Sequence, residues 1–179
     1  MHKKLKKKIK RIGILGGTFD PPHKGHLEIS KIVIKKLKLD KLIWIVTKKN
    51  PFKKKPNLNK NKRIALSKKL TKTHKKIFVK YLDKKIKSSS TFYLLNYIKK
   101  KNKKCKLYFL IGSDNLLKFN KWYNWKKIPE LAKIVIFPRK NYPNKLPRFI
   151  PKKIKNKNFW IFIKAKQINI SSSLIRKYW

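Results

Sequence analysis

The stretch from residue 11 to residue 26, RIGILGGTFDPPHKGH, limits the possible folds more than any other part of the chain. A short apolar run ends in Gly16 and Gly17, and His23 and His26 precede a segment with apolar residues at helical spacing. The pattern predicts a strand, a glycine turn and a helix whose first residues carry imidazoles. Backbone N–H groups and the helix dipole attract phosphate at such a turn, and glycine lets a ligand come close. The segment therefore predicts a phosphate-binding site.

Apolar and amphipathic segments alternate along the rest of the chain. Strands are predicted at 11–15, 42–46, 77–82, 107–112, 134–137 and 159–163. Helices are predicted at about 24–38, 62–70, 91–99, 114–118 and 125–131, with long loops at 47–61 and 138–153. This alternation indicates an α/β fold with a doubly wound parallel sheet, which binds ligands at the carboxyl ends of its strands. The chain shows no repeat and no second domain, so we expect one domain over residues 1–179.

Several features limit where such a chain works. Its longest apolar runs hold roughly six residues, far short of the ~20 that a membrane-spanning helix needs. The basic first residues lead into a glycine-broken strand instead of the apolar core of a signal peptide. Cys105 is the only cysteine, which excludes a disulfide framework and a thiolate metal cluster, and we expect it to be buried on a strand. These features predict a cytoplasmic protein with no membrane segment.

The chain carries a net charge of +47, from 53 lysines and arginines and 6 acidic residues. One interpretation is nucleic-acid binding. The lysines are spread along the whole chain, however, and only five basic residues are arginine, the type suited to base edges. The pattern favours a solvated surface that binds polyanions non-specifically at low salt, and a selected polyanion partner stays open as the alternative. Against this background Asp20 and Asp114 are expected to have specific roles.

Three segments carry a resemblance to a known family. GGTFDPPHKGH, at 16–26, resembles the H-x-G-H signature of the nucleotidylyltransferase superfamily, and its longer form is similar to that of bacterial nicotinate-nucleotide adenylyltransferases. GSDNLLKFNKWYNW, at 112–125, resembles their G-x-D-x-L…F…W-Y stretch, and ISSSLIR, at 170–176, resembles I-S-S-T-x-I-R. The resemblance implies a Rossmann-like fold and transfer of AMP from ATP to nicotinate mononucleotide. The products would be pyrophosphate and nicotinate adenine dinucleotide, an intermediate of NAD biosynthesis.

The resemblance also implies roles for individual residues. His23 and His26 would be catalytic and would hold the ATP phosphates, which would carry Mg²⁺; no metal bound by the protein itself is expected. The other ATP-binding residues would be Gly16, Gly17, Thr18, Phe19, Asp114, Ile170, Ser171, Ser172, Ser173 and Arg176. The mononucleotide-binding residues would be Gly17, Thr18, Lys53, Thr91, Trp122, Tyr123 and Arg139.

The chemistry of these residue types agrees with the resemblance. Adenylyl transfer needs no covalent intermediate, so positioning and stabilisation of charge on phosphate oxygens suffice, and the chain offers no activated nucleophile. The indole face of Trp122 can stack on a pyridine ring. Purely structural roles stay open as alternatives: the histidines and serines as helix caps or core residues, Asp114 as a helix cap, and the aromatic residues as core.

The sequence departs from the family pattern at several positions. Ser90 stands where the family has the tyrosine of S-Y-T, and residues 50–53 read Asn-Pro-Phe-Lys where the family has P-P-H-[KR]. A third phosphate-side histidine is therefore missing. These departures concern Lys53 and the exact substrate contacts and leave the reaction class unchanged. Two other interpretations stay open: an adenylyltransferase for another acceptor, such as nicotinamide mononucleotide or phosphopantetheine, and a basic nucleic-acid-binding protein with a vestigial nucleotide site. Trp122, Tyr123 and GGTFDPPH argue against phosphopantetheine, and the retained phosphate-contacting motif residues argue against a vestigial site. The oligomeric state cannot be inferred from the sequence.

Overall fold

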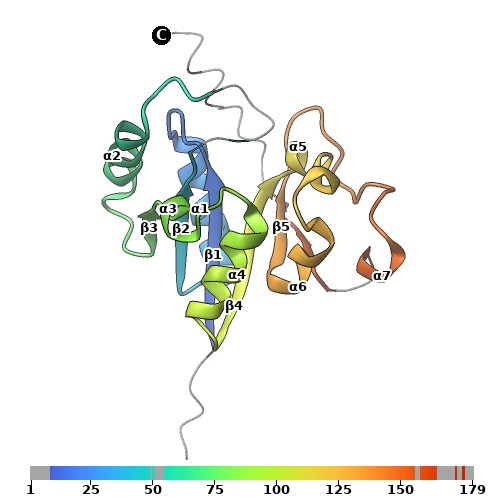
Figure 1. Cartoon of the computed structure of the whole chain (residues 1–179). Helices are drawn as coiled ribbons and strands as arrows, with labels where there is room; N and C mark the ends of the chain where they lie inside the picture. Colours follow the sequence, from blue (N-terminus) through green and yellow to red (C-terminus); the bar gives the residue numbers. More distant parts are fainter. Residues whose placement is uncertain are drawn as a thin grey trace, which may run out of the picture.

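A computed structural model describes residues 9–48, 50, 55–155, 158–164, 172 and 175 of the chain. The strands of its central sheet are β1 (Lys10–Gly17), β2 (Lys41–Val46), β3 (Ile77–Lys80), β4 (Cys105–Gly112), β5 (Lys133–Phe137) and β6 (Trp160–Phe162). They lie in the order β3-β2-β1-β4-β5-β6, and every neighbouring pair is parallel (Figure 1). The predicted doubly wound α/β fold is confirmed.

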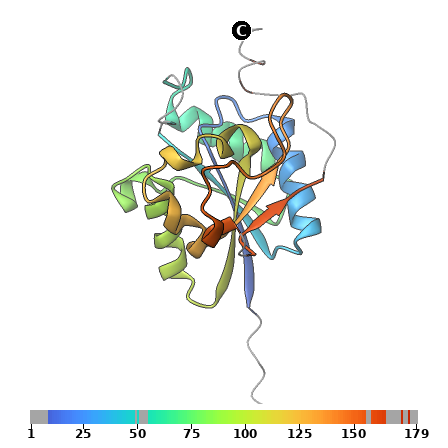
Figure 2. The same ribbon diagram turned by 90° about the vertical axis from the view of Figure 1, so that its right-hand side faces the viewer.

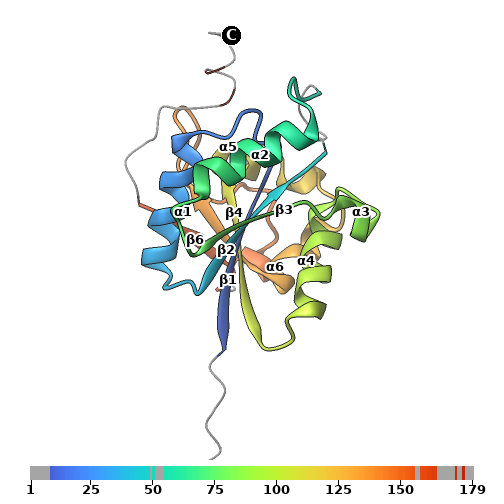
Figure 3. The same cartoon turned by 90° about the vertical axis from the view of Figure 1, so that its left-hand side faces the viewer.

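Helices cover both faces of this sheet. They are α1 (Lys24–Lys36), α2 (Lys60–Thr71), α3 (Asp83–Ile86), α4 (Thr91–Lys101), α5 (Ser113–Leu116), α6 (Ile128–Leu131) and α7 (Lys152–Lys155), with 3-10 turns η1 (Phe119–Lys121) and η2 (Trp125–Lys127). Views from the β6 edge (Figure 2) and the β3 edge (Figure 3) show α1 on one face of the sheet and α4 and α6 on the other. The connections on the β1-β2-β3 side and those on the β4-β5 side therefore cover opposite faces, as in a doubly wound sheet.

Side chains along β4 show how the sheet divides the interior into two cores. Leu107, Phe109 and Ile111 join the core beneath α4 and α6, while Tyr108 and Leu110 join the core beneath α1. This alternation is the period of two that a strand imposes. Both faces of the sheet are covered, so apolar runs such as 42–46 are buried throughout, as their composition predicted.

The predicted elements occur in the predicted order but differ at their ends. Gly16 and Gly17, expected in a turn, are the last two residues of β1, because they pair with Ile45 and Val46 in the parallel ladder with β2. The carbonyl oxygen of Gly17 also accepts the N–H of Thr47 at 2.9 Å. The predicted strand 77–82 was too long, since β3 ends earlier and α3 follows. The expected loop 138–153 contains the start of α7, which had not been predicted.

Two predictions from composition can be compared with the described residues. Cys105 is the first residue of β4, is buried and has a free thiol, as expected. Burial raises the pKa of this thiol, so it is less reactive than an exposed one. Within the described ranges, no helix combines the length and the apolar character needed to cross a membrane.

Candidate active site

A cavity of about 1500 Å³ lies at the carboxyl ends of the strands. The end of β1, the start of α1, the segment before α4, the end of β4 and the loop after β5 contribute to its wall. All the predicted site residues that the structure describes line it: Gly16, Gly17, Thr18, Phe19, His23, His26, Thr91, Asp114, Trp122, Tyr123, Arg139 and Ser172. Residues far apart in the sequence are therefore brought together, because parallel strands deliver their carboxyl ends to one edge of the sheet.

Unpartnered polar atoms gather around this cavity. In the described part of the chain, five buried side-chain atoms have no hydrogen-bond partner: His23 Nδ1, Ser90 Oγ, Asp114 Oδ1, Trp122 Nε1 and Arg139 Nε. All five residues line the cavity. Most buried polar groups in folded proteins are hydrogen-bonded, so such a concentration of exceptions needs a reason. Donors and acceptors that converge on one cavity indicate a site for a polar ligand.

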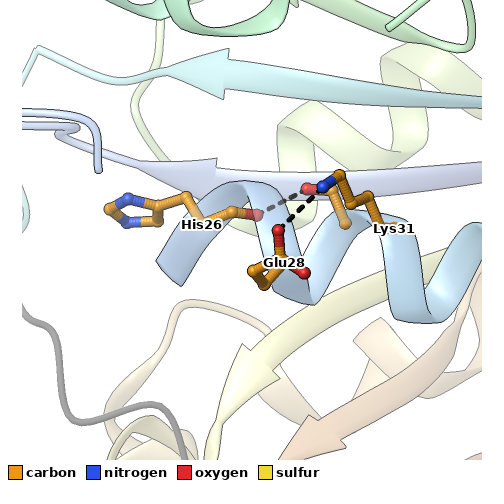
Figure 4. A network of polar contacts seen from close by, with 4 residues as sticks. His26, Glu28 and Lys31 are labelled. Atoms are coloured by element: carbon orange, nitrogen blue, oxygen red, sulfur yellow. Dashed lines mark hydrogen bonds and ion pairs between the residues drawn. The ribbon is translucent and has the colours of Figure 1, made fainter. Parts of the chain in front are cut away.

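The two histidines lie against each other at the start of α1. His23 is the N-cap residue, and its backbone N–H donates to Nδ1 of His26 at 3.3 Å. The ring centroids are 3.8 Å apart. Because Nδ1 of His26 accepts this bond, Nε2 carries the proton when the ring is neutral. Figure 4 shows the His26 ring extending beyond the first turn of α1, away from the Glu28–Lys31 ion pair on the same helix.

A chain of buried contacts fixes this first turn from beneath. Trp44 Nε1 donates to Ser30 Oγ at 2.8 Å, and that hydroxyl donates to the carbonyl oxygen of His26 at 2.7 Å. Phe19 stacks on Trp44 with ring centroids 4.8 Å apart and 9° between the planes, and it contacts the His26 ring at 4.8 Å. Phe19 holds a φ of 50°, uncommon for a residue with a side chain. The core therefore sets the position of the His26 ring.

The environment of His23 keeps its imidazole neutral. The ring is almost completely buried, and burial together with the positive charge of Arg139 lowers the pKa of His23 to about 4. At neutral pH the ring therefore offers one N–H donor and one acceptor nitrogen, and carries no charge.

A pH effect on stability follows from this pKa. An unfolded chain carries histidine with a pKa near 6.5, so between pH 6.5 and 4 the unfolded state binds a proton that folded His23 does not bind. Stability is therefore lost as the pH falls through this window. We expect the free energy of unfolding to fall less between these pH values in His23→Gln than in the unchanged chain. Urea unfolding at several pH values measures both slopes, and equal slopes would contradict the assignment.

Gly112 lets two charged side chains meet at the end of β4. A Cβ atom at this position would overlap Asp114 Oδ1 and lie 3.1 Å from Arg139 Nε. The same two atoms are 3.7 Å apart and form a partly exposed ion pair. The backbone N–H of Arg139 donates to Ser113 Oγ at 3.0 Å, which ties the loop after β5 to the first residue of α5. Asp114 is paired with an arginine rather than capping a helix, so its capping alternative is not supported.

Aromatic side chains form another part of the wall. The Trp122 ring packs against Phe119 and Phe109, with centroid distances of 5.4 and 6.0 Å. Half-exposed Tyr123 stacks on Tyr93 with centroids 5.3 Å apart and 17° between the planes, and the two hydroxyls are 3.2 Å apart. Trp122 therefore combines a core contact with a place on the cavity wall.

Five of the predicted site residues lie outside the described residues: Lys53, Ile170, Ser171, Ser173 and Arg176. Ser172 is described, and its hydroxyl donates to the carbonyl oxygen of Pro21 at 2.8 Å. This contact brings Ser172 to the turn that precedes the histidines. In the described ranges, no three histidine, cysteine or acidic side chains converge in a way that could hold a metal ion.

Sequence reasoning missed one buried residue beside the site, Arg63 of α2. Its side chain is 2% exposed and donates hydrogen bonds to backbone carbonyls at the ends of β1 and β2. Asp20, which the sequence had singled out, is 4% exposed and accepts two backbone N–H groups. A signal was available for Arg63, since it is one of only five arginines in a chain dominated by lysine.

Comparisons with known proteins agree with this geometry. A family model described as cytidylyltransferase-like matches residues 14–178. A protein of Pelagibacter ubique, named as a probable nicotinate-nucleotide adenylyltransferase, is 45% identical over 97% of this chain and 96% of its own length. A protein of the same name from a Nitratiruptor species is 34% identical over 81% of this chain and 79% of its own length.

A solved structure adds evidence on the fold. It is titled Plasmodium falciparum nicotinic acid mononucleotide adenylyltransferase complexed with NaAD, and it superposes with a TM-score of 0.74 at 21% identity. The match covers 94% of this chain and 83% of that one. At 21% sequence identity, the superposition shows that the two proteins share the arrangement of the sheet and helices.

Proposed function

The chain belongs to the nicotinate-nucleotide adenylyltransferase family, and from this premise we propose that residues 1–179 form one domain that transfers AMP from ATP to nicotinate mononucleotide. The phosphate oxygen of the mononucleotide attacks the α-phosphorus of ATP, and the bond from that phosphorus to the bridging oxygen of pyrophosphate breaks. The products are nicotinate adenine dinucleotide and pyrophosphate, and the reaction belongs to NAD biosynthesis. The observation that carries the proposal is the set of family-motif residues around one cavity that is rich in unpartnered polar atoms.

The histidines act in this proposal as donors to phosphate oxygens. Negative charge shifts toward the pyrophosphate as its bond breaks, so donors already fixed in place stabilise the transition state. His26 presents Nε2–H from a ring whose other nitrogen is held by the His23 backbone. His23 is neutral and adds a second directed donor. The N-terminal N–H groups of α1 contribute a further positive potential at the same place.

The two substrates occupy different parts of the cavity wall. We assign ATP to the histidine side, with backbone contacts from 16–19, ribose contacts from Asp114 and phosphate contacts from the motif at 170–176. The mononucleotide lies against Trp122, whose indole stacks on its pyridine ring. The remaining mononucleotide contacts come from Gly17, Thr18, Lys53, Thr91, Tyr123 and Arg139.

Magnesium enters this reaction as part of the ATP complex. Mg²⁺ keeps several waters and is commonly held by substrate phosphates together with one or two carboxylates. Asp20 and Asp114 are the acidic residues among those that line the cavity, and both are already engaged by backbone N–H groups or by Arg139. Two carboxylates that already have partners fit a magnesium ion that is bound mainly by the ATP phosphates. There the ion would shield the phosphate charge.

The function is tested by a pyrophosphate-release assay with purified chain. Release should require both ATP and nicotinate mononucleotide, and chromatography should identify the dinucleotide. Nicotinamide mononucleotide and phosphopantetheine serve as competing acceptors in parallel reactions. Faster release with either of them would replace the proposed acceptor, and no release with any acceptor would refute adenylyl transfer.

The net charge of +47 leads to a separate expectation about the surface. Self-repulsion destabilises the folded chain, and salt screens it, so Tm should rise between roughly 20 and 200 mM NaCl. Duplex DNA of arbitrary sequence should bind at low salt and dissociate steeply as salt increases. Thermal melts and fluorescence titrations measure the two effects. Sequence-selective binding above physiological salt would instead support a selected nucleic-acid partner.

We propose a cytoplasmic location for this reaction. The single cysteine is buried with a free thiol, which suits a reducing compartment.

A further inference from the structure

One buried guanidinium connects three backbone segments beside the cavity. Arg63 Nη1 donates to the carbonyl oxygen of Thr18 at 2.6 Å and to that of Thr47 at 2.8 Å. Its Nε donates to the carbonyl oxygen of Leu58 at 3.1 Å, and Nη2 lies 3.4 Å from the carbonyl oxygen of Lys48. The turn after β1, the end of β2 and the loop before α2 are thus held by a single side chain.

Asp20 binds the same loop through that loop's backbone N–H groups. Its Oδ2 accepts the N–H of Asn57 and its Oδ1 accepts the N–H of Leu58, both at 2.8 Å. Since Thr18 and Asp20 belong to one turn, the contacts close a ring from that turn through Arg63 to the loop and back through Asp20. We call this ring the turn–loop clasp.

The buried positive charge of Arg63 lies near the negative charges of Asp20 and Asp83. Burial lowers the pKa of Arg63, while the negative charges of Asp20 and Asp83 act in the opposite direction and favour its charged form. Asp83 faces the same region and accepts the N–H of Lys48 at 2.8 Å. A planar guanidinium can hold several carbonyls in fixed directions, whereas a lysine ammonium on a flexible stem cannot. The geometry therefore depends on arginine and not on charge alone.

Arg63 fixes the cavity wall without forming part of it. Thr18, Asp20, Thr47 and Asn57 line the cavity, whereas Arg63 is not among the lining residues. Arg63 lies outside the three segments on which the family resemblance rests. Its hydrogen bonds end on backbone atoms of the wall, so any effect on substrates is transmitted through the wall.

We propose that Arg63, together with Asp20, positions the turn 18–23 against the loop 55–58 and thereby sets the rate of adenylyl transfer. The proposal rests on the proposed function. Arg63 is a positioning residue in this scheme. A displacement of about 1 Å in a catalytic constellation can cost on the order of 10²-fold in rate, so loss of the guanidinium fork acts on the histidines and on the substrate-binding backbone together.

The test compares Arg63→Lys with Arg11→Lys as a matched control. Arg11 also uses its guanidinium for hydrogen bonds, from Nε and Nη2 to Tyr108 Oη at 3.2 and 3.0 Å, but it lies toward the amino end of β1 and does not line the cavity. At temperatures where both variants are folded, we expect kcat of Arg63→Lys to fall about tenfold or more, and kcat of Arg11→Lys to stay within about twofold of the unchanged chain. Unchanged kcat in folded Arg63→Lys would overturn the proposal.

A second readout does not depend on turnover. Histidine NMR titration follows His23, whose pKa is lowered to about 4 by burial and by Arg139. A loosened turn lets water reach the ring, so the pKa should move toward 6.5 in Arg63→Lys and stay unchanged in Arg11→Lys. An unmoved His23 titration in Arg63→Lys would contradict the positioning role.

If Arg63→Lys does not fold, Asp20→Asn tests the same ring from its other side. An asparagine side chain keeps one acceptor oxygen and places an NH₂ group against the second backbone N–H, so kcat should fall in the same direction. Unchanged kcat and an unmoved His23 titration would overturn the proposal. If the unchanged chain and Arg11→Lys form no dinucleotide, the proposed function fails, and the His23 titration still tests the turn–loop clasp.

Discussion

Replacing His26 with alanine should lower kcat by about 10²-fold or more, the usual scale for loss of a preorganised donor to developing negative charge. The fold should survive, because Phe19 and Trp44 beneath the ring stack on each other and stay packed in the core when the ring is removed. Losing the single hydrogen bond from the His23 N–H to the ring costs about 1 kcal/mol of stability. Steady-state pyrophosphate release and a thermal melt measure the two effects on the same sample.

Two amide variants separate the roles of the two ring nitrogens. His26→Asn places an oxygen near the position of Nδ1, so it keeps the acceptor for the His23 N–H but loses the donor at Nε2. His26→Gln places an NH₂ group near Nε2 and should retain more turnover than His26→Asn. His74→Ala is the matched control, because this histidine lies in the turn between α2 and β3, away from the cavity. Turnover of His26→Ala close to that of the unchanged chain would refute the catalytic role.

Replacing Trp122 with alanine should raise KM for the mononucleotide by roughly 5- to 150-fold, since stacking of an aromatic side chain on a base contributes about 1–3 kcal/mol. KM for ATP should change little, because ATP is assigned to the histidine side of the cavity. The unchanged chain should prefer nicotinate over nicotinamide mononucleotide, since the neutral amide loses charge-assisted hydrogen bonds. Initial rates with each substrate varied in turn give all three quantities.

Trp122 also packs against Phe119, so a control must account for lost packing. Trp125 provides it, because its ring contacts Phe119 and Phe149 at 6.1 and 5.9 Å and does not line the cavity. Trp125→Ala should lower Tm while leaving KM for the mononucleotide unchanged. Two results would contradict this placement of the pyridine pocket: a Trp122→Ala change that raises only KM for ATP, or an equal rise in KM for the mononucleotide in Trp125→Ala.

Local sequence patterns predicted the parts of the site that single segments form. The two histidines lie within one strand-turn-helix unit, so spacing alone was enough to place them at the start of α1. The boundary of β1 was less accessible, because Gly16 and Gly17 extend the strand only through pairing with β2, a distant segment. The stacking of Tyr123 on Tyr93 likewise joins two separate segments and has no local signal.

Arg63 shows why the rest of the site could not be predicted. Helix prediction looks for an apolar stripe, but the buried residues of α2 are Arg63, Ser67 and Thr71. The two hydroxyls donate to carbonyl oxygens one turn earlier in the same helix, at 2.8 and 2.9 Å. The buried serine and threonine therefore need no partner from another element. The partners of the arginine are backbone carbonyls, which any residue type provides. The residue types at those positions therefore give no sign that an arginine binds their carbonyl oxygens.

The five polar atoms around the cavity that have no hydrogen-bond partner lower the stability of the free fold while serving to bind a polar ligand. His23 Nδ1, Ser90 Oγ and Trp122 Nε1 are buried with no hydrogen bond, and Asp114 Oδ1 and Arg139 Nε have only the 3.7 Å ion pair between them. The ligand-free fold is therefore less stable than it would be with apolar groups of the same shape. Substitutions that remove such groups are therefore the ones that selection for heat resistance would favour first. The same substitutions delete the contacts that a polar ligand requires. Stabilising this protein without weakening recognition must therefore begin away from the carboxyl ends of the strands.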